Sequence, residues 1–175
     1  MDRADGRSLR IALVGFGVGG LGVGIDQALK FWAETSLSVG ERIPILGDAF
    51  GIQLAYNPGA AFSFGEAFTP VITVIAVAAV VVVSWLIART ISRGWAVGLG
   101  LILGGALGNL IDRLARPPGF GVGYVVDYLA YGDWFIGNLA DAFIVVGFAV
   151  CVVLSLLGRR MRPIPVRATP SPSET

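Results

Sequence analysis

The chain has 175 residues, of which 55% are hydrophobic and 14% are charged, and its mean hydropathy is +0.76. Soluble domains carry about 25% charged residues, so this composition excludes a globule surrounded by water and indicates a polytopic membrane protein. The net charge is +1, and the loops assigned below to the outer side of the membrane carry no basic patch. The sequence therefore gives no reason to expect a nucleic acid partner.

Four apolar stretches are long enough to be membrane-spanning helices. We expect them at about residues 11–28, 71–88, 95–111 and 136–157. Basic residues precede the first stretch, as in a secretory signal, but no small-residue cleavage site follows it, so we interpret it as an uncleaved anchor. Between the first two spans, residues 42–56 partly alternate between apolar and polar, which predicts one or two short strands at the membrane surface.

The distribution of arginine predicts the orientation of these spans. Nine of the thirteen Lys and Arg residues precede the first span, separate the second from the third, or follow the fourth. The positive-inside rule therefore places both termini in the cytoplasm and the loops 31–69 and 114–135 outside. We expect a single membrane domain over residues 1–157, followed by a basic, Pro/Ser-rich and disordered cytoplasmic tail over 158–175.

Glycine spacing predicts close packing between the first and third spans. Small residues at every fourth position let helix backbones approach each other in lipid. The glycines with this spacing are Gly100, Gly104 and Gly108 in the third span, and Gly15 and Gly19, or Gly20 and Gly24, in the first. Asn109, Asp112 and Arg113 then share one helix face beside the predicted seam.

Three segments place acids and amides inside apolar sequence: GNLIDR at 108–113, VVDY at 125–128 and NLAD at 138–141. An Asp inside a bilayer costs roughly 2.5–3.5 kcal/mol, so such residues indicate a reaction site or an ion path. The chain contains no histidine and one cysteine, Cys151, within the last span. A Ser/His/Asp triad, a Cys/His pair and a thiolate or imidazole zinc site are therefore excluded, and we expect no metal and no cofactor.

A pair of carboxylates remains, and Asp127 and Asp141 are the best placed, because residues 128–137 can fold back between them. Two carboxyls a few ångströms apart share one proton, so one acts as a base and the other as an acid. The pair is then suited to activating water against a carbonyl group. The alternative for either Asp is a structural ion pair with Arg113 or Arg116.

The same residues are compatible with two other functions. One is a proton- or ion-coupled carrier with a relay of acids, although these acids cluster toward one face and no inverted repeat is visible. The relay would consist of Asp26, Asp112, Asp127 and Asp141. The other is a protease with a Ser/Lys dyad, formed by the single lysine, Lys30, and a serine such as Ser63.

Five fragments, in order, resemble the bacterial lipoprotein signal peptidases (signal peptidase II). They are DQALKFW, NPGAAFSF, GGALGNLIDR, VVDY and NLADAFIVVG, between residues 25 and 147. The resemblance implies an aspartic endopeptidase of the bacterial cytoplasmic (inner) membrane, with four transmembrane helices and a small extracytoplasmic β-rich cradle. Its expected partners are membrane lipid and prolipoproteins modified with diacylglycerol, whose signal peptide it cuts immediately before the lipidated cysteine. We expect a monomer.

The same resemblance assigns roles to individual residues. Asp127 and Asp141 match the catalytic pair. The residues that match the substrate site are Asn57, Asn109, Arg113 and Asn138, and the supporting acids are Asp26 and Asp112. The segment RPPGFG at 116–121 lengthens the stretch between Arg113 and Asp127 beyond the usual family spacing, which leaves open a register with Asp112 or Asp133 in the pair.

Overall fold

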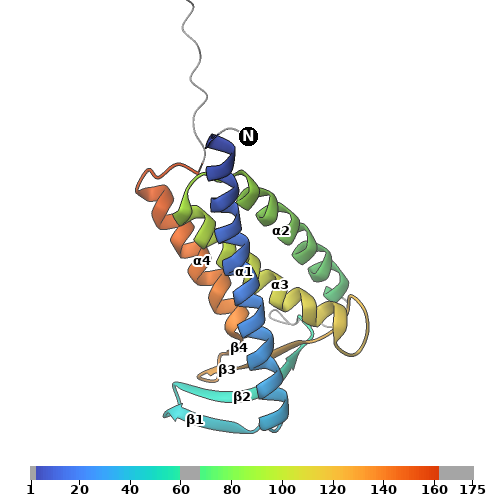
Figure 1. Cartoon of the computed structure of the whole chain (residues 1–175). Helices are drawn as coiled ribbons and strands as arrows, with labels where there is room; N and C mark the ends of the chain where they lie inside the picture. Colours follow the sequence, from blue (N-terminus) through green and yellow to red (C-terminus); the bar gives the residue numbers. More distant parts are fainter. Residues whose placement is uncertain (1–2, 60–67, 162–175) are drawn as a thin grey trace, which may run out of the picture.

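The computed structural model describes residues 3–59 and 68–161. Its helices are α1 (Arg3–Ser36), α2 (Thr69–Arg89), α3 (Arg93–Ala115) and α4 (Leu139–Leu156). All four are long and apolar enough to cross a membrane, and a small antiparallel sheet lies at one end of them (Figure 1). The predicted fold class is confirmed. The tail expected over 158–175 falls mostly on residues 162–175, which lie outside the described part of the chain.

Helix α1 is much longer than the expected span of 11–28. With 34 residues it extends about 50 Å, whereas the hydrocarbon core of a bilayer is about 30 Å thick. Its last turns leave the helix bundle and pack on the sheet, where Ala33 is fully buried against Leu54, Val126 and Tyr128. Hydropathy alone ends this helix too early because its final turns are stabilised by a soluble-type core.

Helix α4 begins three residues later than expected. Residues 136 and 137 belong to strand β4 (Phe135–Gly137), and α4 starts only after Asn138, whose side chain caps the helix. The apolar run crosses from strand to helix without interruption, so hydropathy could not separate the two elements. The signal for the boundary was Asn138 followed three residues later by Asp141, because an Asn–x–x–acid pattern can form a capping box.

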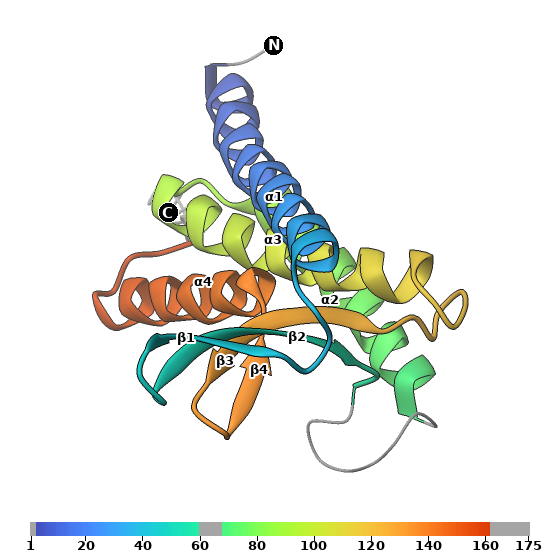
Figure 2. The same ribbon diagram turned by 90° about the horizontal axis from the view of Figure 1, so that it is seen from below.

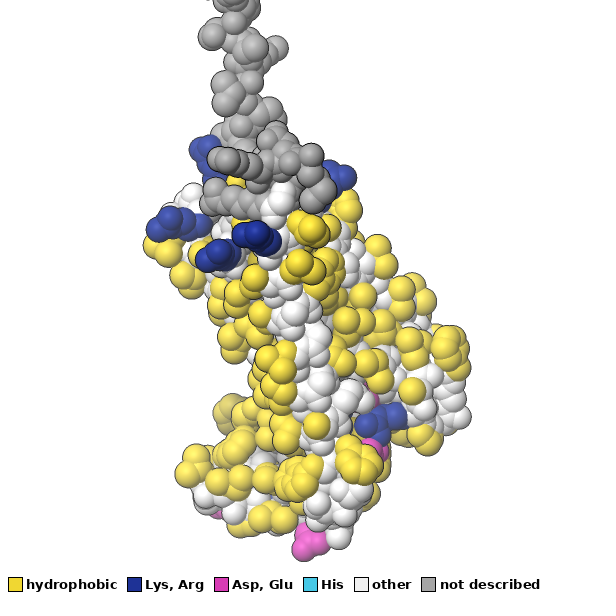
Figure 3. All heavy atoms as spheres, in the orientation of Figure 1, with side chains coloured by type: hydrophobic (Ala, Val, Ile, Leu, Met, Phe, Trp, Pro, Cys, Tyr) yellow, Lys and Arg dark blue, Asp and Glu magenta, His cyan; other side chains and the backbone are white. Residues whose placement is uncertain are grey.

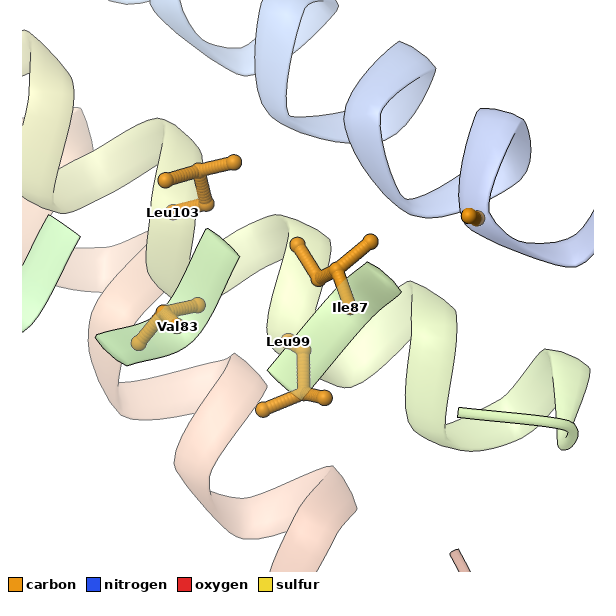
Figure 4. Packing of buried hydrophobic residues seen from close by; sticks show 5 residues of the cluster. Val83, Ile87, Leu99 and Leu103 are labelled. Atoms are coloured by element: carbon orange, nitrogen blue, oxygen red, sulfur yellow. The ribbon is translucent and has the colours of Figure 1, made fainter. Parts of the chain in front are cut away.

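Helix α3 is the centre of the bundle. Half of the residues in its apolar window are buried, against 28% or less in the other three helices, and it contacts all of them. Against α2, Leu99 and Leu103 pack on Val83 and Ile87 (Figure 4). This position explains why α3 runs beyond the expected 95–111, since its polar last turns are enclosed by protein rather than lipid.

The glycine seam between α1 and α3 forms as predicted, and the structure selects one of the two glycine pairs on α1. A Cβ atom at Gly100 would lie 2.5 Å from the carbonyl oxygen of Gly15, and one at Gly104 would lie 2.9 Å from that of Gly19. Added Cβ atoms at Gly20 and Gly24 would meet nothing within 4 Å.

The sheet has strand order β1-β2-β3-β4, with antiparallel neighbours. Strands β1 (Arg42–Leu46) and β2 (Phe50–Asn57) fall in the segment where strands were expected. Strand β3 (Val125–Tyr131) and β4 form a hairpin in a segment where the sequence predicted a loop and the start of a helix. Seen from below in Figure 2, the sheet lies across the ends of α1, α3 and α4, so β3 meets the polar ends of the helices.

Substitution of one seam glycine tests this packing. We expect Gly100→Ala to lower the stability in detergent by about 1–3 kcal/mol, because its Cβ atom has to displace the α1 backbone. The measurement is thermal unfolding, with Gly20→Ala as the matched control, since that position has open space. Equal melting temperatures for the two variants would show that the seam does not need glycine at Gly100.

Candidate active site

Asp127 and Asp141 reach one polar cluster from different elements. Asp127 lies on β3, Asp141 lies in the first turn of α4, and the β3–β4 hairpin folds the chain back between them. Asn138 joins the two acids. Its Nδ2 donates to Asp127 Oδ1 at 2.6 Å, and its Oδ1 accepts from the backbone N–H of Asp141 at 3.1 Å. The residue that caps α4 therefore also binds the carboxyl group on the neighbouring strand.

Two further amides complete the hydrogen bonding of the acids. Asn57 Nδ2 donates to Asp127 Oδ2 at 2.9 Å from the adjacent strand β2. Asn57 Oδ1 accepts from the N–H of Gly59 at 2.8 Å, so the turn formed by this Asn-Pro-Gly sequence directs the amide nitrogen at Asp127. Asn109 Nδ2 donates to Asp141 Oδ1 at 2.9 Å, while the N–H of Asn138 donates to Asp141 Oδ2 at 3.2 Å.

The two carboxyl groups differ in their environment. Burial raises the pKa of Asp127 from an ordinary value of 3.8 to about 7, and the negative charge of Asp141 adds to this shift. The hydrogen bonds from Asn57 and Asn138 oppose it, because they stabilise the ionised form. A carboxyl group with a pKa of about 7 can hold a proton at neutral pH, so Asp127 is suited to donating one.

A second cluster of charged residues contacts the first through Lys30, which donates to Asn109 Oδ1. Lys30 Nζ contacts Asp26 Oδ2 at 2.9 Å and Asp112 Oδ2 at 2.7 Å, and all three side chains are fully buried. Arg116 binds the other oxygen of Asp112 at 2.8 Å and pairs with Glu34. Asp26 Oδ1 also accepts from the backbone N–H of Ala140 at 3.1 Å, at the start of α4.

Arg113 lies on the side of the cluster that faces the turn after β2. The residue is 7% exposed, and its Nη1 atom has no hydrogen-bond partner within residues 3–59 and 68–161. An added Cβ atom on Gly59 would lie 2.7 Å from Ile72 Cδ1 and 3.4 Å from Arg113 Nη2, and φ at Gly59 is +102°, so the close contact with Ile72 and the backbone both favour glycine there. A buried guanidinium group with a free donor is suited to binding a carbonyl or carboxylate oxygen.

Comparison with known proteins identifies the family of this chain. A family model described as signal peptidase (SPase) II matches residues 18–157. The chain belongs to the signal peptidase II family. A lipoprotein signal peptidase of Mycobacterium avium (strain 104) is 46% identical over 134 residues, which are 77% of this chain and 74% of that protein. One of Rhodococcus jostii (strain RHA1) is 43% identical over 144 residues, which are 82% and 72% of the two chains.

A solved structure has the same fold. A bacterial membrane enzyme determined at 1.9 Å by the in meso method is 26% identical, with a TM-score of 0.64 over 86% of this chain and 93% of that chain. This member of the signal peptidase II family is therefore a multi-pass membrane protease that cleaves the signal peptides of lipoproteins. The resemblance found in the five sequence fragments is confirmed.

In this family member the alternative registers do not form a pair of acids. Asp133 lies in the turn of the β3–β4 hairpin, 97% exposed, and pairs with Arg42 at 3.1 Å. The carboxylate of Asp112 forms ion pairs with Lys30 and Arg116. The extra residues of RPPGFG form a loop beyond α3 and leave the approach of Asp127 to Asp141 intact.

The supporting contacts of three charged residues, Lys30, Glu34 and Arg116, were not predicted from the sequence. Lys30 was considered only as the partner of Ser63, which lies outside the described residues. In the structure its Nζ atom contacts Asp26, Asp112 and Asn109, so its polar partners are carboxylates and an amide rather than a serine. The signal was helical spacing, because Asp26, Lys30 and Glu34 are four residues apart, as are Asp112 and Arg116.

The raised pKa of Asp127 predicts how stability depends on pH. Between pH 3.8 and about 7 the folded protein holds a proton that the unfolded chain has lost, so stability falls as the pH rises through this range. We expect Asp127→Asn to remove this loss and to be more stable than the parent at about pH 8, by on the order of a few kcal/mol, and similar to it at about pH 4.

Thermal unfolding in detergent at the two pH values measures this difference. Asp133→Asn is the control, because that carboxyl group is exposed and should show no such pH dependence. An Asp127→Asn protein that is less stable than the parent at the higher pH would contradict the assignment of a buried, protonated carboxyl group.

Proposed function

We propose that this protein is an aspartic endopeptidase whose catalytic pair is Asp127 and Asp141. The observation that carries the proposal is Asn138. Its side chain binds the carboxyl group of Asp127 and the backbone N–H of Asp141, and its own backbone N–H binds the carboxyl group of Asp141, which fixes one residue against the other. We further propose that the substrate is a prolipoprotein modified with diacylglycerol and that the cut bond immediately precedes the lipidated cysteine.

In the proposed mechanism the pair shares one proton, held by Asp127. Ionised Asp141 takes a proton from a water molecule while the water oxygen attacks the scissile carbonyl carbon and Asp127 gives its proton to the carbonyl oxygen. The resulting tetrahedral diol then collapses. Asp141 gives its proton to the leaving nitrogen as the C–N bond breaks, and Asp127 takes back a proton from a diol hydroxyl group, which restores the starting state.

The polar residues around the pair divide into two groups. Both amide hydrogens of Asn138 are used, on Asp127 and on Asn109 Oδ1 at 3.2 Å, so its proposed role is to position the pair. Arg113 keeps an unused donor within the described residues, and Asn57 has one amide hydrogen beyond the one given to Asp127. We therefore assign contact with the substrate backbone to Arg113 and Asn57.

An apolar groove beside these residues supports a lipidated substrate. It has a volume of about 600 Å³, within the range of about 300–1,000 Å³ that is usual for ligand pockets. It lies between α2 and the chain that follows α3, and its lining includes Val74, Val77, Leu114, Phe120 and Val122. Val74 is 68% exposed, so the groove opens on the outer surface of the bundle, where lipid is the solvent.

Two connections along the chain link the lining of the groove to the polar site. Leu114 follows Arg113 on α3, and Thr69, one turn before Thr73 of the lining, donates to the carbonyl oxygen of Pro58 beside Asn57. The hydroxyl group of Thr73 is itself engaged with the carbonyl oxygens of Thr69 and Gly121. A lining whose hydroxyl group is already engaged suits a hydrocarbon chain, which can enter from the lipid and pack on the apolar side chains.

The distribution of charge supports the proposed orientation. The exposed arginines gather at the end of the bundle opposite the sheet, close to the N-terminus (Figure 3). They are Arg10, Arg89, Arg93, Arg159 and Arg160. The positive-inside rule then places this end in the cytoplasm and the sheet on the outer side of the bacterial inner membrane. The acids of the site gather at the sheet end, which fits a protease better than a relay across the membrane.

Removal of either acid tests the reaction type. We expect Asp127→Asn and Asp141→Asn each to lower the rate of cleavage of a lipidated, signal-bearing peptide by about 100- to 10,000-fold. The reason is that an amide neither accepts a proton from water nor shares one with its partner. The assay uses purified protein, and Asp133→Asn should keep the parent rate. Turnover at the parent rate in either amide variant would remove that residue from the pair.

Filling the groove tests the lipid part of the proposal. We expect Val77→Trp to lower kcat/KM about tenfold or more for a diacylglyceryl peptide, since the indole occupies the space of an acyl chain, and to have little effect on the same peptide with short acyl chains. Val81→Trp, one turn further along α2 and outside the lining, is the control. Equal losses for both peptides would argue against an acyl chain in the groove.

A further inference from the structure

We propose that Lys30 is a positioning residue, which holds the carboxamide of Asn109 in the one orientation that donates a hydrogen bond to Asp141. The inference rests on the proposed aspartic mechanism and adds a residue that reaches the pair only through another side chain. Lys30 lies on α1, Asn109 on α3 and Asp141 on α4, so the connection joins three helices.

Each hydrogen of the Lys30 ammonium group has a defined acceptor. Two go to the carboxylates Asp26 and Asp112, and the third goes to Asn109 Oδ1 at 2.9 Å. The side chain is fully buried, so water does not replace any of these partners. The two carboxylates alone would neutralise the lysine, and the bond to Asn109 is therefore not required for charge balance.

The bonds from Lys30 and Asn138 together determine which end of the Asn109 amide faces Asp141, and Lys30 supplies the shorter and charged one. Asn109 Oδ1 accepts from Lys30 Nζ and from Asn138 Nδ2, which leaves Nδ2 to donate to Asp141 Oδ1 at 2.9 Å. If the amide were reversed, its oxygen would face a carboxylate and its NH₂ group would face an ammonium group. Lys30 therefore favours the orientation that stabilises the ionised form of the pair.

The charge of Lys30 also acts on the pair through space, so the two effects have to be separated. The charged or titratable groups around Asp141 are Asp127 and Tyr128 on β3, Arg113 on α3, and Lys30 itself behind Asn109. A direct charge effect does not need Asn109, whereas a positioning effect does. A double-mutant cycle between Lys30 and Asn109 measures this difference.

The test uses the variant Lys30→Met/Asp26→Asn, in which one positive and one negative charge are removed together. The amide that replaces the Asp26 carboxylate retains an oxygen for the N–H of Ala140. The readout is the acidic limb of the pH profile of kcat/KM, which reports ionisation of the pair. We expect this limb to move to higher pH by about one unit, because the ionised pair loses a hydrogen bond. In an Asn109→Ala background the same substitutions should move it by less than about a third of that.

A charge-matched control leaves Asn109 untouched. Glu34→Gln/Arg116→Gln removes the other ion pair on Asp112, and it should lower the melting temperature without moving the acidic limb. If Lys30→Met/Asp26→Asn does not fold, Lys30→Met/Asp112→Asn takes its place in the cycle. An equal shift with and without Asn109, or no shift, overturns the positioning role. Loss of activity in Asp127→Asn separates that result from failure of the aspartic mechanism, in which Asp127→Asn would stay active.

Discussion

The start of α4 is the constraint on which the site depends. A helix that begins inside a protein leaves backbone N–H groups that must find acceptors, and here they find Asn138 and Asp26. Asn138 then has its amide nitrogen free to bind Asp127. Satisfying the end of one helix therefore fixes the geometry of two acids on different elements, and local folding and the proposed chemistry use the same hydrogen bonds.

Much of the site could be predicted from sequence because its residues violate the pattern around them. Asp127, Asp141 and Asn109 stand out in apolar surroundings, where a polar side chain has a high cost and so indicates a role. The glycine spacing in α3 predicted the helix seam, because small residues at every fourth position let two helix backbones approach each other in lipid.

Other features could not be predicted because they depend on contacts distant in sequence. Lys30 meets Asp112 and Asn109 across about 80 residues, and only its i, i+4 relation to Asp26 was visible locally. Strand β3 is buried on most of its length, so its apolar residues resembled the neighbouring membrane spans more than a strand. The end of α1 was missed because Ala33 is buried by the sheet, which hydropathy does not detect.

The length of α1 has a consequence for the membrane around the protein. A continuous helix of about 50 Å that is packed on the sheet at one end connects the sheet directly to the part of α1 that is apolar enough to cross the membrane. When the hydrocarbon layer thickens or thins, such a helix responds by tilting, or the lipid around it deforms. A hydrophobic mismatch at α1 is therefore transmitted to the sheet, and with it to Asp127 on β3.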